Sequence, residues 1–351
     1  MKKVYVDNHK LMYHPERTKE WLEKGDCPPI YVEIGPTDAC NHKCVFCALD
    51  YLDCQGKYIN TEIMLQALKD MAEKGGKSIM FGGEGGPFLH KDICLFTNKA
   101  KEYGLDISFT TNGTFFNKPK IEQCLHNISW IKFSIDAGTP ESYAEVHGTN
   151  KEDFEKLMTN IQDAVEHRKQ NNIKTTIGAQ CLIIPQAIES IANLAERLKQ
   201  IGVDYLILKP YSKHPQSINE FIINPEEYNQ LEESLKKFHS NDFKIIFRKA
   251  TIERMDTERD YHECHGTSFM ALIDARGNVI PCNLFYNNEE FTYGNLNQQS
   301  FSEIWKGEKR KQVLERLRQK GISECRNGCR LDSTNRYLHR LKNPHEHDNF
   351  I

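Results

Sequence analysis

The sequence predicts an α/β fold built as an incomplete barrel of alternating parallel strands and helices, a partial (β/α)6 TIM barrel. Short runs of β-branched and aromatic residues alternate with amphipathic stretches from about residue 30 onward. Strands separated by helices pair in parallel as βαβ units, which is the basis of this prediction. An open, doubly wound sheet shares the alternation and is the alternative. Near residue 250 the pattern changes to that of a β-hairpin followed by a helix.

The predicted elements follow one another closely along the chain. Strand patterns occur at 29–35, 77–83, 105–113, 129–137, 174–184 and 203–211. Helical spacing of apolar residues occurs at 60–75, 148–172 and 187–202. We expect Asn60 to cap the first of these helices and Gly75 and Gly76 to end it. Residues 214–228 are expected to form a surface loop.

The second part of the chain is predicted to be smaller and organised differently. Residues 268–285 suggest a β-hairpin that turns at Arg276, Gly277 and Asn278, and 300–319 suggests a single helix. We therefore divide the chain into an N-terminal extension, a barrel, a small metal-held domain and a tail. Their predicted bounds are 1–29, 30–249, 250–335 and 336–351.

Composition excludes several classes of function. A formal net charge of −3 gives no reason to expect nucleic acid or an anionic membrane as partner. The N-terminus lacks the apolar segment of a signal peptide, and no apolar run is long enough to cross a membrane. The sequence therefore predicts a cytoplasmic protein.

The twelve cysteines include two groups whose chemistry points to metal. Thiols in a reducing compartment rarely form structural disulfides, so clustered cysteines indicate metal binding or catalysis. Cys40, Cys44 and Cys47 form the first group, in "DACNHKCVFCALD". Three thiolates on a cubane iron–sulfur cluster leave one iron open. The second group has four cysteines, which suit a fully ligated cluster or, alternatively, structural zinc; they are Cys264, Cys282, Cys325 and Cys329.

The first cysteine group resembles the cluster motif of the radical S-adenosylmethionine (SAM) enzymes. Its spacing is C-x-x-x-C-x-x-C, with the aromatic Phe46 just before the last cysteine. The resemblance implies that the open iron of a [4Fe–4S] cluster chelates SAM. Reduction of the cluster would then cleave SAM to methionine and a 5′-deoxyadenosyl radical. An external one-electron donor such as flavodoxin or ferredoxin is implied as partner.

Further motifs occur in the order that this family shows. Gly82, Gly83 and Glu84 in "FGGEGGP" are similar to the motif that receives the methionine amino group, although Gly85 and Gly86 intervene before the proline. "TTNGT" and "FSIDAGTPESYAEVHGT" continue the resemblance, which implies SAM contacts from Asn112, Ser134, Asp136 and His147. Many relatives carry arginine where His147 stands. The other interpretation of Asp136 is a helix cap or turn residue.

The second cysteine group resembles a SPASM or twitch domain. Cys264, Gly277 and Cys282 fit its opening pattern, and Cys325 and Cys329 supply a later pair. The chain lacks the further cysteines of a full SPASM domain there, so the shorter twitch type is expected, with one auxiliary [4Fe–4S] cluster. This gives two clusters per chain.

The substrate prediction rests on a missing module. Only about thirty residues precede the first strand, too few for the peptide-recognition domain of many peptide-modifying relatives. We therefore expect a small hydroxylated substrate, such as a sugar, aminocyclitol or nucleotide-linked sugar, and dehydrogenation of its secondary alcohol. Polar residues after the sixth strand are expected to contact it at the barrel mouth; they are Lys209, Tyr211, Ser212 and His214.

Three alternatives remain open for the reaction. The first is a radical epimerase, in which Cys181 or Cys54 would return a hydrogen atom to the substrate. The second is a peptide-modifying maturase. The third is a non-enzymatic iron–sulfur or zinc-binding protein, which leaves the glycine-rich and "FSIDAG" motifs unexplained.

Overall fold

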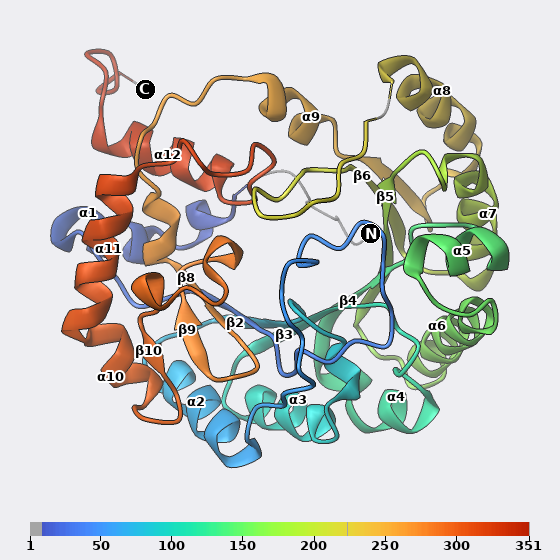
Figure 1. Ribbon diagram of the computed structural model, residues 1–351, viewed down its shortest axis with the longest axis horizontal. Coiled ribbons are helices and arrows are strands. Elements are labelled where there is room, and N and C mark those ends of the chain that lie inside the picture. Colours follow the sequence, from blue (N-terminus) through green and yellow to red (C-terminus); the bar gives the residue numbers. More distant parts are fainter. Residues whose placement is uncertain (1–8, 223, 351) are drawn as a thin grey trace.

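The core of the protein is one ten-stranded sheet that curves into an open barrel (Figure 1). The structure is a computed structural model that describes residues 9–222 and 224–350. The strand order is β10-β9-β8-β1-β2-β3-β4-β5-β6-β7, and all pairs from β8 through β7 are parallel. The strands are β1 Tyr31–Ile34, β2 Ser78–Phe81, β3 Asp106–Thr111, β4 Ile128–Ser134, β5 Thr176–Ile183, β6 Tyr205–Pro210, β7 Lys244–Phe247, β8 Met270–Ile273, β9 Asn278–Ile280 and β10 Gly294–Asn295.

The predicted partial barrel is confirmed, and each of the six predicted strands contains one strand of the structure, β1 to β6. The sheet also has strands at each end of this series that the sequence did not reveal. β7 extends it beyond β6, and β8 joins β1 in parallel, with Tyr31 opposite Met270. Because β8 is the first strand of the predicted hairpin, the predicted small domain continues the barrel sheet.

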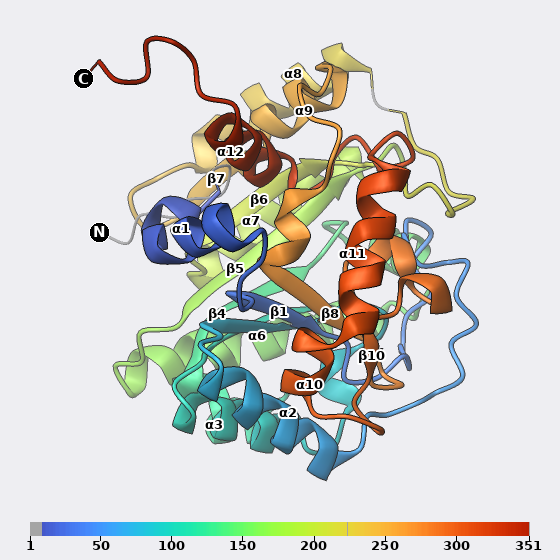
Figure 2. The ribbon, with the colours of Figure 1, turned by 90° about the vertical axis from the view of Figure 1, so that its left-hand side faces the viewer.

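Helices cover the outer surface of the barrel. The carboxyl ends of the parallel strands all lie at one end of the barrel. Helices α2 to α7 surround β1 to β6, while α10, α11 and α12 lie beside the hairpin (Figures 1 and 2). The helices are α1 Pro15–Lys24, α2 Thr61–Glu73, α3 Ile93–Glu102, α4 Lys118–Cys124, α5 Pro140–His147, α6 Glu152–Gln170, α7 Ile191–Ile201, α8 Pro225–Leu235, α9 Lys249–Asp256, α10 Phe301–Lys306, α11 Glu308–Lys320 and α12 Asp332–Lys342.

Local sequence signals set most helix ends. Asn60 caps α2, its side chain accepting hydrogen bonds from the backbone N–H groups of Glu62 and Ile63, as predicted. The single helix predicted over 300–319 is wrong, because Gly307 adopts an extended conformation between α10 and α11. A Cβ at this position would lie 2.9 Å from the carbonyl oxygen of Glu303, so a glycine allows the chain to turn there.

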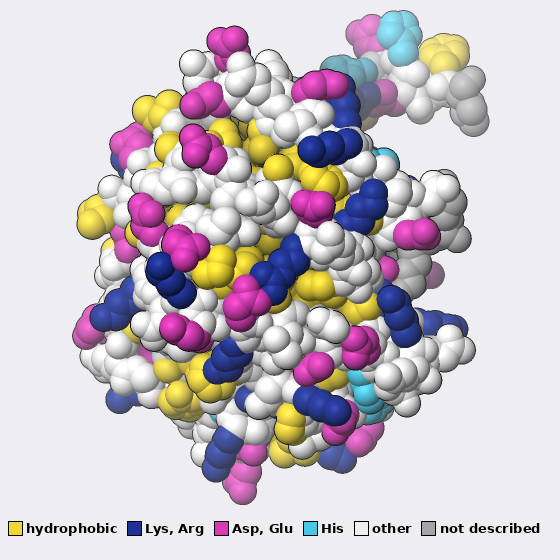
Figure 3. Space-filling model, turned by 90° about the vertical axis from the view of Figure 1, so that its right-hand side faces the viewer, with side chains coloured by type: hydrophobic (Ala, Val, Ile, Leu, Met, Phe, Trp, Pro, Cys, Tyr) yellow, Lys and Arg dark blue, Asp and Glu magenta, His cyan; other side chains and the backbone are white. Residues whose placement is uncertain are grey.

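The apolar core lies between the sheet and its helices, and a smaller cluster lies under the N-terminal extension. Trp21 of α1 is 2% exposed and packs against Phe269, just before β8. The extension therefore packs against the segment that leads into β8. The C-terminal segment after α12 stands away from the body, so it does not cover the barrel (Figures 2 and 3). The face drawn in Figure 3 intersperses charges of both signs.

Candidate active site

The first cysteine group lies in the loop that follows β1, at the carboxyl ends of the parallel strands. This loop is held by both neighbouring parts of the chain. The Asp38 carboxylate accepts backbone N–H bonds from Gln55 and Lys57 and pairs with Arg276 of the hairpin turn at 3.3 Å. The backbone N–H of Gly86 donates to the Ala39 carbonyl at 2.8 Å. The loop is thereby fixed against the glycine-rich segment.

The thiols of this group are electrostatic neighbours. Burial raises the pKa of all three, and Asp136 and the other two cysteines raise that of Cys44 further. Thiolates here therefore need a bound cation. Among residues 9–222 and 224–350, no three Cys, His, Asp or Glu side chains converge closely enough for a single metal ion. Three neighbouring cysteines can supply three thiolate ligands to an iron–sulfur cluster.

His147, which was predicted to contact SAM, bonds through its ring to the cluster loop and to the segment after β4. Its Nε2 accepts the backbone N–H of Asp136 at 3.0 Å. Burial lowers the pKa of His147 well below its usual value, so the ring is neutral. Because Nε2 is an acceptor, the ring proton lies on Nδ1, which is 3.3 Å from Sγ of Cys44. The histidine thus donates to a candidate cluster ligand. Phe46 packs edge-on against this ring at 5.3 Å between centroids.

Asp136 is neither the helix cap of its alternative interpretation nor fully paired. Thr139 caps α5 instead, with a capping box to Ser142. One Asp136 carboxylate oxygen accepts the backbone N–H of Leu182, while Oδ2 is buried without a hydrogen-bond partner. Burial raises the pKa of this carboxyl to about 7. An orphaned buried oxygen beside Cys44 suits a polar ligand such as SAM.

The glycine-rich segment packs directly on the cluster loop. A Cβ at Gly85 would lie 2.3 Å from the carbonyl oxygen of Thr37 and 2.5 Å from that of Ala39. Glu84 is buried, and its Oε1 accepts the backbone N–H of Ala275 in the hairpin turn. Burial raises the pKa of Glu84 to about 7. Glu84 therefore ties the glycine-rich segment to the second domain, and its other oxygen is left as the one that could receive an ammonium.

The other predicted SAM contacts lie on the same side. Asn112 donates through Nδ2 to Asn41 at 3.0 Å and also contacts His42 Nδ1. Asn112 thus supports the cluster loop from β3. Ser134 ends β4 beside Gln180 in the ladder and is half-buried. Gly82 and Gly83 follow β2, and Gly83 has a φ of 104°, which favours glycine.

The second cysteine group also assembles from distant parts of the chain. Cys264 precedes β8, Cys282 follows β9, and Cys325 and Cys329 lie between α11 and α12. Burial raises the pKa of Cys264 to about 12 and that of Cys325 to about 11, and the neighbouring cysteines raise both further. The same causes raise the pKa of Cys282 well above its usual value. These four thiols are electrostatic neighbours and fit a fully ligated cluster.

Of the four predicted substrate residues, Lys209 faces the lumen of the barrel. The other three, Tyr211, Ser212 and His214, hold a loop in place. The Tyr211 hydroxyl donates to the Asn219 carbonyl at 3.0 Å. Ser212 accepts hydrogen bonds from Arg326. His214 is fully buried and stacks on Tyr51, with ring centroids 5.2 Å apart. Residues 211–222 therefore form a loop packed on the cluster loop, rather than the purely exposed loop that was predicted.

The two candidate hydrogen-donating cysteines differ sharply in position. Cys181 is 0% exposed and belongs to the core between β5 and its helices. Its neighbours Gln180 and Leu182 take the opposite side of the strand. Cys181 therefore does not line the lumen. Cys54 is exposed in the cluster loop, and partial burial and Asp38 raise its pKa to about 11.

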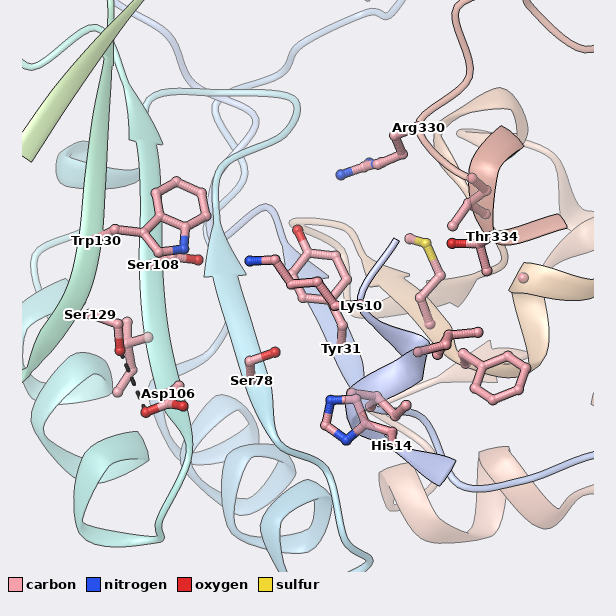
Figure 4. A pocket seen from close by; sticks show the side chains of 17 residues that line it. Lys10, His14, Tyr31, Ser78, Asp106, Ser108, Ser129, Trp130, Arg330 and Thr334 are labelled. Carbon is pink, nitrogen blue, oxygen red and sulfur yellow. Dashed lines mark hydrogen bonds between the residues drawn. The ribbon is translucent and has the colours of Figure 1, made fainter. Parts of the chain in front are cut away.

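The sequence analysis missed the charged residues inside the barrel. They are Glu33, Lys132, Arg248, Arg326 and Arg330. Glu33 and Lys132 interrupt the apolar runs "YVEIG" and "WIKFSIDA", and a lone charge in a buried strand is the signal that could have found them. At the N-terminal ends of β1 to β4 a cavity of about 360 Å³ opens, into which Lys10 and Arg330 point (Figure 4).

Comparison with known proteins shows which families and relatives this chain resembles. Residues 34–180 match the Radical SAM superfamily, and residues 264–330 match SPASM, an iron–sulfur cluster-binding domain. The chain is 24% identical over 306 residues to the tungsten-containing aldehyde ferredoxin oxidoreductase cofactor-modifying protein of Pyrococcus furiosus, covering 80% of this chain and 81% of that one. It is 25% identical over 280 residues to a GTP 3′,8-cyclase of Desulforamulus reducens, covering 74% and 82%.

Two further proteins are similar to this chain over most of its length. A cysteine-type anaerobic sulfatase-maturating enzyme of Clostridium novyi is 22% identical over 325 residues, covering 83% of this chain and 85% of that one. The crystal structure of Streptococcus suis SuiB bound to precursor peptide SuiA has the same fold, with a TM-score of 0.66 at 15% identity, covering 90% and 75%. None of the described helices is long and apolar enough to cross a membrane. The chain therefore contains a radical SAM domain followed by a C-terminal SPASM-type domain, and these domains imply [4Fe–4S] clusters and SAM as cofactors.

Proposed function

We propose that this enzyme abstracts hydrogen from a carbon atom of a peptide substrate, as a maturase. A cluster held by Cys40, Cys44 and Cys47, with SAM bound to it, would supply the 5′-deoxyadenosyl radical for this step. The observation that carries the proposal is the placement of these cysteines, Asp136 and the 211–222 loop together at the carboxyl ends of the strands. An external donor such as flavodoxin or ferredoxin would deliver the electron.

The 211–222 loop supports a peptide as substrate. Asn219 donates through Nδ2 to the Cys47 carbonyl at 3.2 Å, and the Ile218 N–H donates to Asp50 at 3.2 Å. The loop therefore lies at the edge of the cluster site. Ile218 and Ile222 are nevertheless 89% and 80% exposed. Exposed apolar side chains beside a reaction site can contact the side chains of a bound peptide.

The relatives support the same choice. SuiB is described with a precursor peptide, and another relative is a sulfatase-maturating enzyme. These relatives give no support to the expected sugar or aminocyclitol substrate, so we replace it. Oxidation remains part of the proposal, because a four-cysteine auxiliary cluster can accept the second electron from a substrate radical. The buried position of Cys181 argues against epimerisation through that thiol.

A second candidate is a reaction on a phosphorylated small molecule. The observation that favours it is the set of basic side chains inside the barrel, namely Lys132, Lys209, Arg248, Arg326 and Arg330. The GTP 3′,8-cyclase relative acts, by its name, on a nucleotide.

The test uses the enzyme with both clusters reconstituted, supplied with SAM, dithionite and a library of short peptides in deuterated water. We expect 5′-deoxyadenosine together with a library peptide that is two mass units lighter and carries no new carbon-bound deuterium. A gain of one mass unit would instead indicate epimerisation with a solvent-exchanged thiol donor. If 5′-deoxyadenosine forms while every peptide keeps its mass, the peptide substrate is wrong.

A further inference from the structure

We propose that the barrel interior contains an oxyanion-binding site, formed by Lys132, Lys209 and Arg330, that holds a carboxylate or phosphate group of the substrate. The site rests on the proposed function, because it names the chemical group by which that function's substrate is held in the lumen. Neither the family matches nor the names of the relatives assign such a site to these residues.

The two lysines project from alternate strands on the inner side of the sheet. Lys132 lies on β4 and Lys209 on β6, and the intervening strand β5 places Gln180 between them. The Lys132 ammonium donates to the Gln180 side-chain carbonyl at 2.9 Å, so the side chains of Lys132 and Gln180 lie on the same face of the sheet. For Lys209 Nζ, no hydrogen-bond acceptor is recorded within 9–222 and 224–350. Its donors are available to a ligand.

The arginines enter the lumen from the segment that carries two auxiliary-cluster cysteines. Arg326 follows Cys325, and Arg330 follows Cys329. Arg326 is held by the Ser212 carbonyl and hydroxyl oxygens. Arg330 reaches the inner face of β1, where it pairs with Glu33. The cluster segment thus positions guanidinium groups over the substrate chamber.

Arg330 remains accessible inside the protein. Its side chain is 42% exposed. It points into the cavity at the N-terminal ends of β1 to β4, opposite Ser108 and Trp130 (Figure 4). The exposed part of the side chain therefore faces this cavity. A guanidinium in such a space can bind a planar oxyanion through two N–H groups.

Positive charge exceeds negative charge in this chamber. Five basic side chains interact electrostatically there, Arg248 and Arg326 in addition to the three that form the site. Of the three residues that form the site, Arg330 pairs with Glu33 and Lys209 interacts with Asp136. Burial and the other cations lower the pKa of Lys209 to about 7 and that of Lys132 to about 8. A bound anion would relieve this repulsion between like charges.

The site adjoins the predicted SAM contacts at one end, where Lys209 interacts electrostatically with Asp136. Those contacts follow the carboxyl ends of β2, β3 and β4, beside Cys44. Glu33 and Tyr31, which interact with Arg330, lie within β1, toward the opposite end of the barrel. An anion held by Lys132, Lys209 and Arg330 would therefore place the rest of a substrate between this site and the SAM site.

The experiment titrates inorganic pyrophosphate and, separately, glutarate into the SAM-saturated enzyme with both clusters in place, by calorimetry at low salt. We expect one of the two anions to bind at one site per chain. Lys209→Gln should weaken that binding about tenfold or more, because a charge-assisted hydrogen bond is lost. The matched control is Lys99→Gln, which removes the same charge from an exposed lysine of α3 paired with Glu102 at 2.7 Å; it should leave the affinity unchanged.

Each outcome decides something separately from the proposed function. Preference for glutarate supports a carboxylate of a peptide, whereas preference for pyrophosphate supports the oxyanion site and argues against the peptide substrate. Equal weakening by both variants would show a nonspecific charge effect and overturn the site. Absence of binding by both anions, or binding that SAM abolishes, would overturn it as well. Lys132→Met, assayed in the same way with cluster absorbance as the folding check, guards against a variant-specific artefact.

Discussion

His147 Nδ1 lies 3.3 Å from Sγ of Cys44, while Nε2 of the same ring accepts the backbone N–H of Asp136. A neutral imidazole with one nitrogen engaged as acceptor must donate through the other. The ring therefore links the end of β4 to the thiol of a candidate cluster ligand. This chain thus uses a histidine that bonds to sulfur.

Replacing His147 with Phe should lower the midpoint potential of the SAM cluster. Hydrogen bonds to cluster sulfur favour the reduced, more negative state, so losing one of about 1 kcal/mol shifts a one-electron couple by on the order of 40 mV. The measurement is a redox titration followed by electron paramagnetic resonance. Tyr143→Phe is the control, since its ring stacks on His147 at 4.1 Å but its hydroxyl has no hydrogen-bond partner. An unchanged potential in the His147 variant would refute the assigned tautomer.

Changing Cys40, Cys44 and Cys47 together to Ala should abolish reductive SAM cleavage. The iron content should fall from about eight to about four per chain, because each cubane cluster holds four irons. The fold should persist, since none of these side chains belongs to the apolar core. Liquid chromatography of 5′-deoxyadenosine checks the activity. Continued formation of 5′-deoxyadenosine by this variant would contradict the site.

The reciprocal variant, Cys325→Ser with Cys329→Ser, should lose the other half of the iron. SAM cleavage should survive, because the first cysteine group is untouched, but modified product should not form. Two causes act together here: the second electron has no acceptor, and Arg326 and Arg330 lose the segment that places them. Full product yield with half the iron would show that the auxiliary cluster is dispensable.

Gly85→Ala should impair assembly of the SAM cluster. The added Cβ would approach the carbonyl oxygens of Thr37 and Ala39 to 2.3 and 2.5 Å, so the backbone of the cluster loop would have to move. Gly86→Ala is a matched control, because its nearest neighbour would be Leu89 Cδ1 at 3.3 Å, the end of a flexible side chain. Iron content and absorbance near 400 nm report the result. Equal cluster yields in the two variants would contradict this packing argument.

Lys209→Gln should stabilise the protein most at lower pH. Burial, followed by Arg326, Lys132, Arg248 and Arg330, lowers the pKa of Lys209 to about 7 in the folded state from its usual 10.5. The unfolded chain therefore binds more protons between these values, and this lysine makes stability rise with pH across that window. Below about pH 7 Lys209 is charged in the folded protein, and the full cost of burying that charge lowers the free energy of unfolding. The gain in Tm of the variant over the wild type should accordingly shrink between pH 6.5 and 9. A gain that grows with pH would contradict the depressed pKa.

Local sequence was sufficient for the parallel strands, the cap at Asn60 and both cysteine groups. Each depends on residues near one another in the chain: alternation of strand and helix patterns, a side-chain cap, and ligand spacing. The motif after β1 also indicated the family, because the spacing of its three cysteines determines the ligands that it offers to a cluster. The break at Gly307 was missed, since a glycine within helical spacing does not reveal whether its backbone is extended.

Tertiary contacts determined how the distant parts meet. Three relationships join segments that are far apart in the chain: the pairing of β8 with β1, the hydrogen bond from His147 to Cys44, and the entry of Arg330 into the barrel. The burial of Cys181 away from the lumen depends instead on which face of its strand points inward. Such relationships follow from the register and closure of the sheet. The sequence therefore shows which candidate ligand residues and charged residues the chain carries. The curvature of the folded sheet determines which of them face the same space.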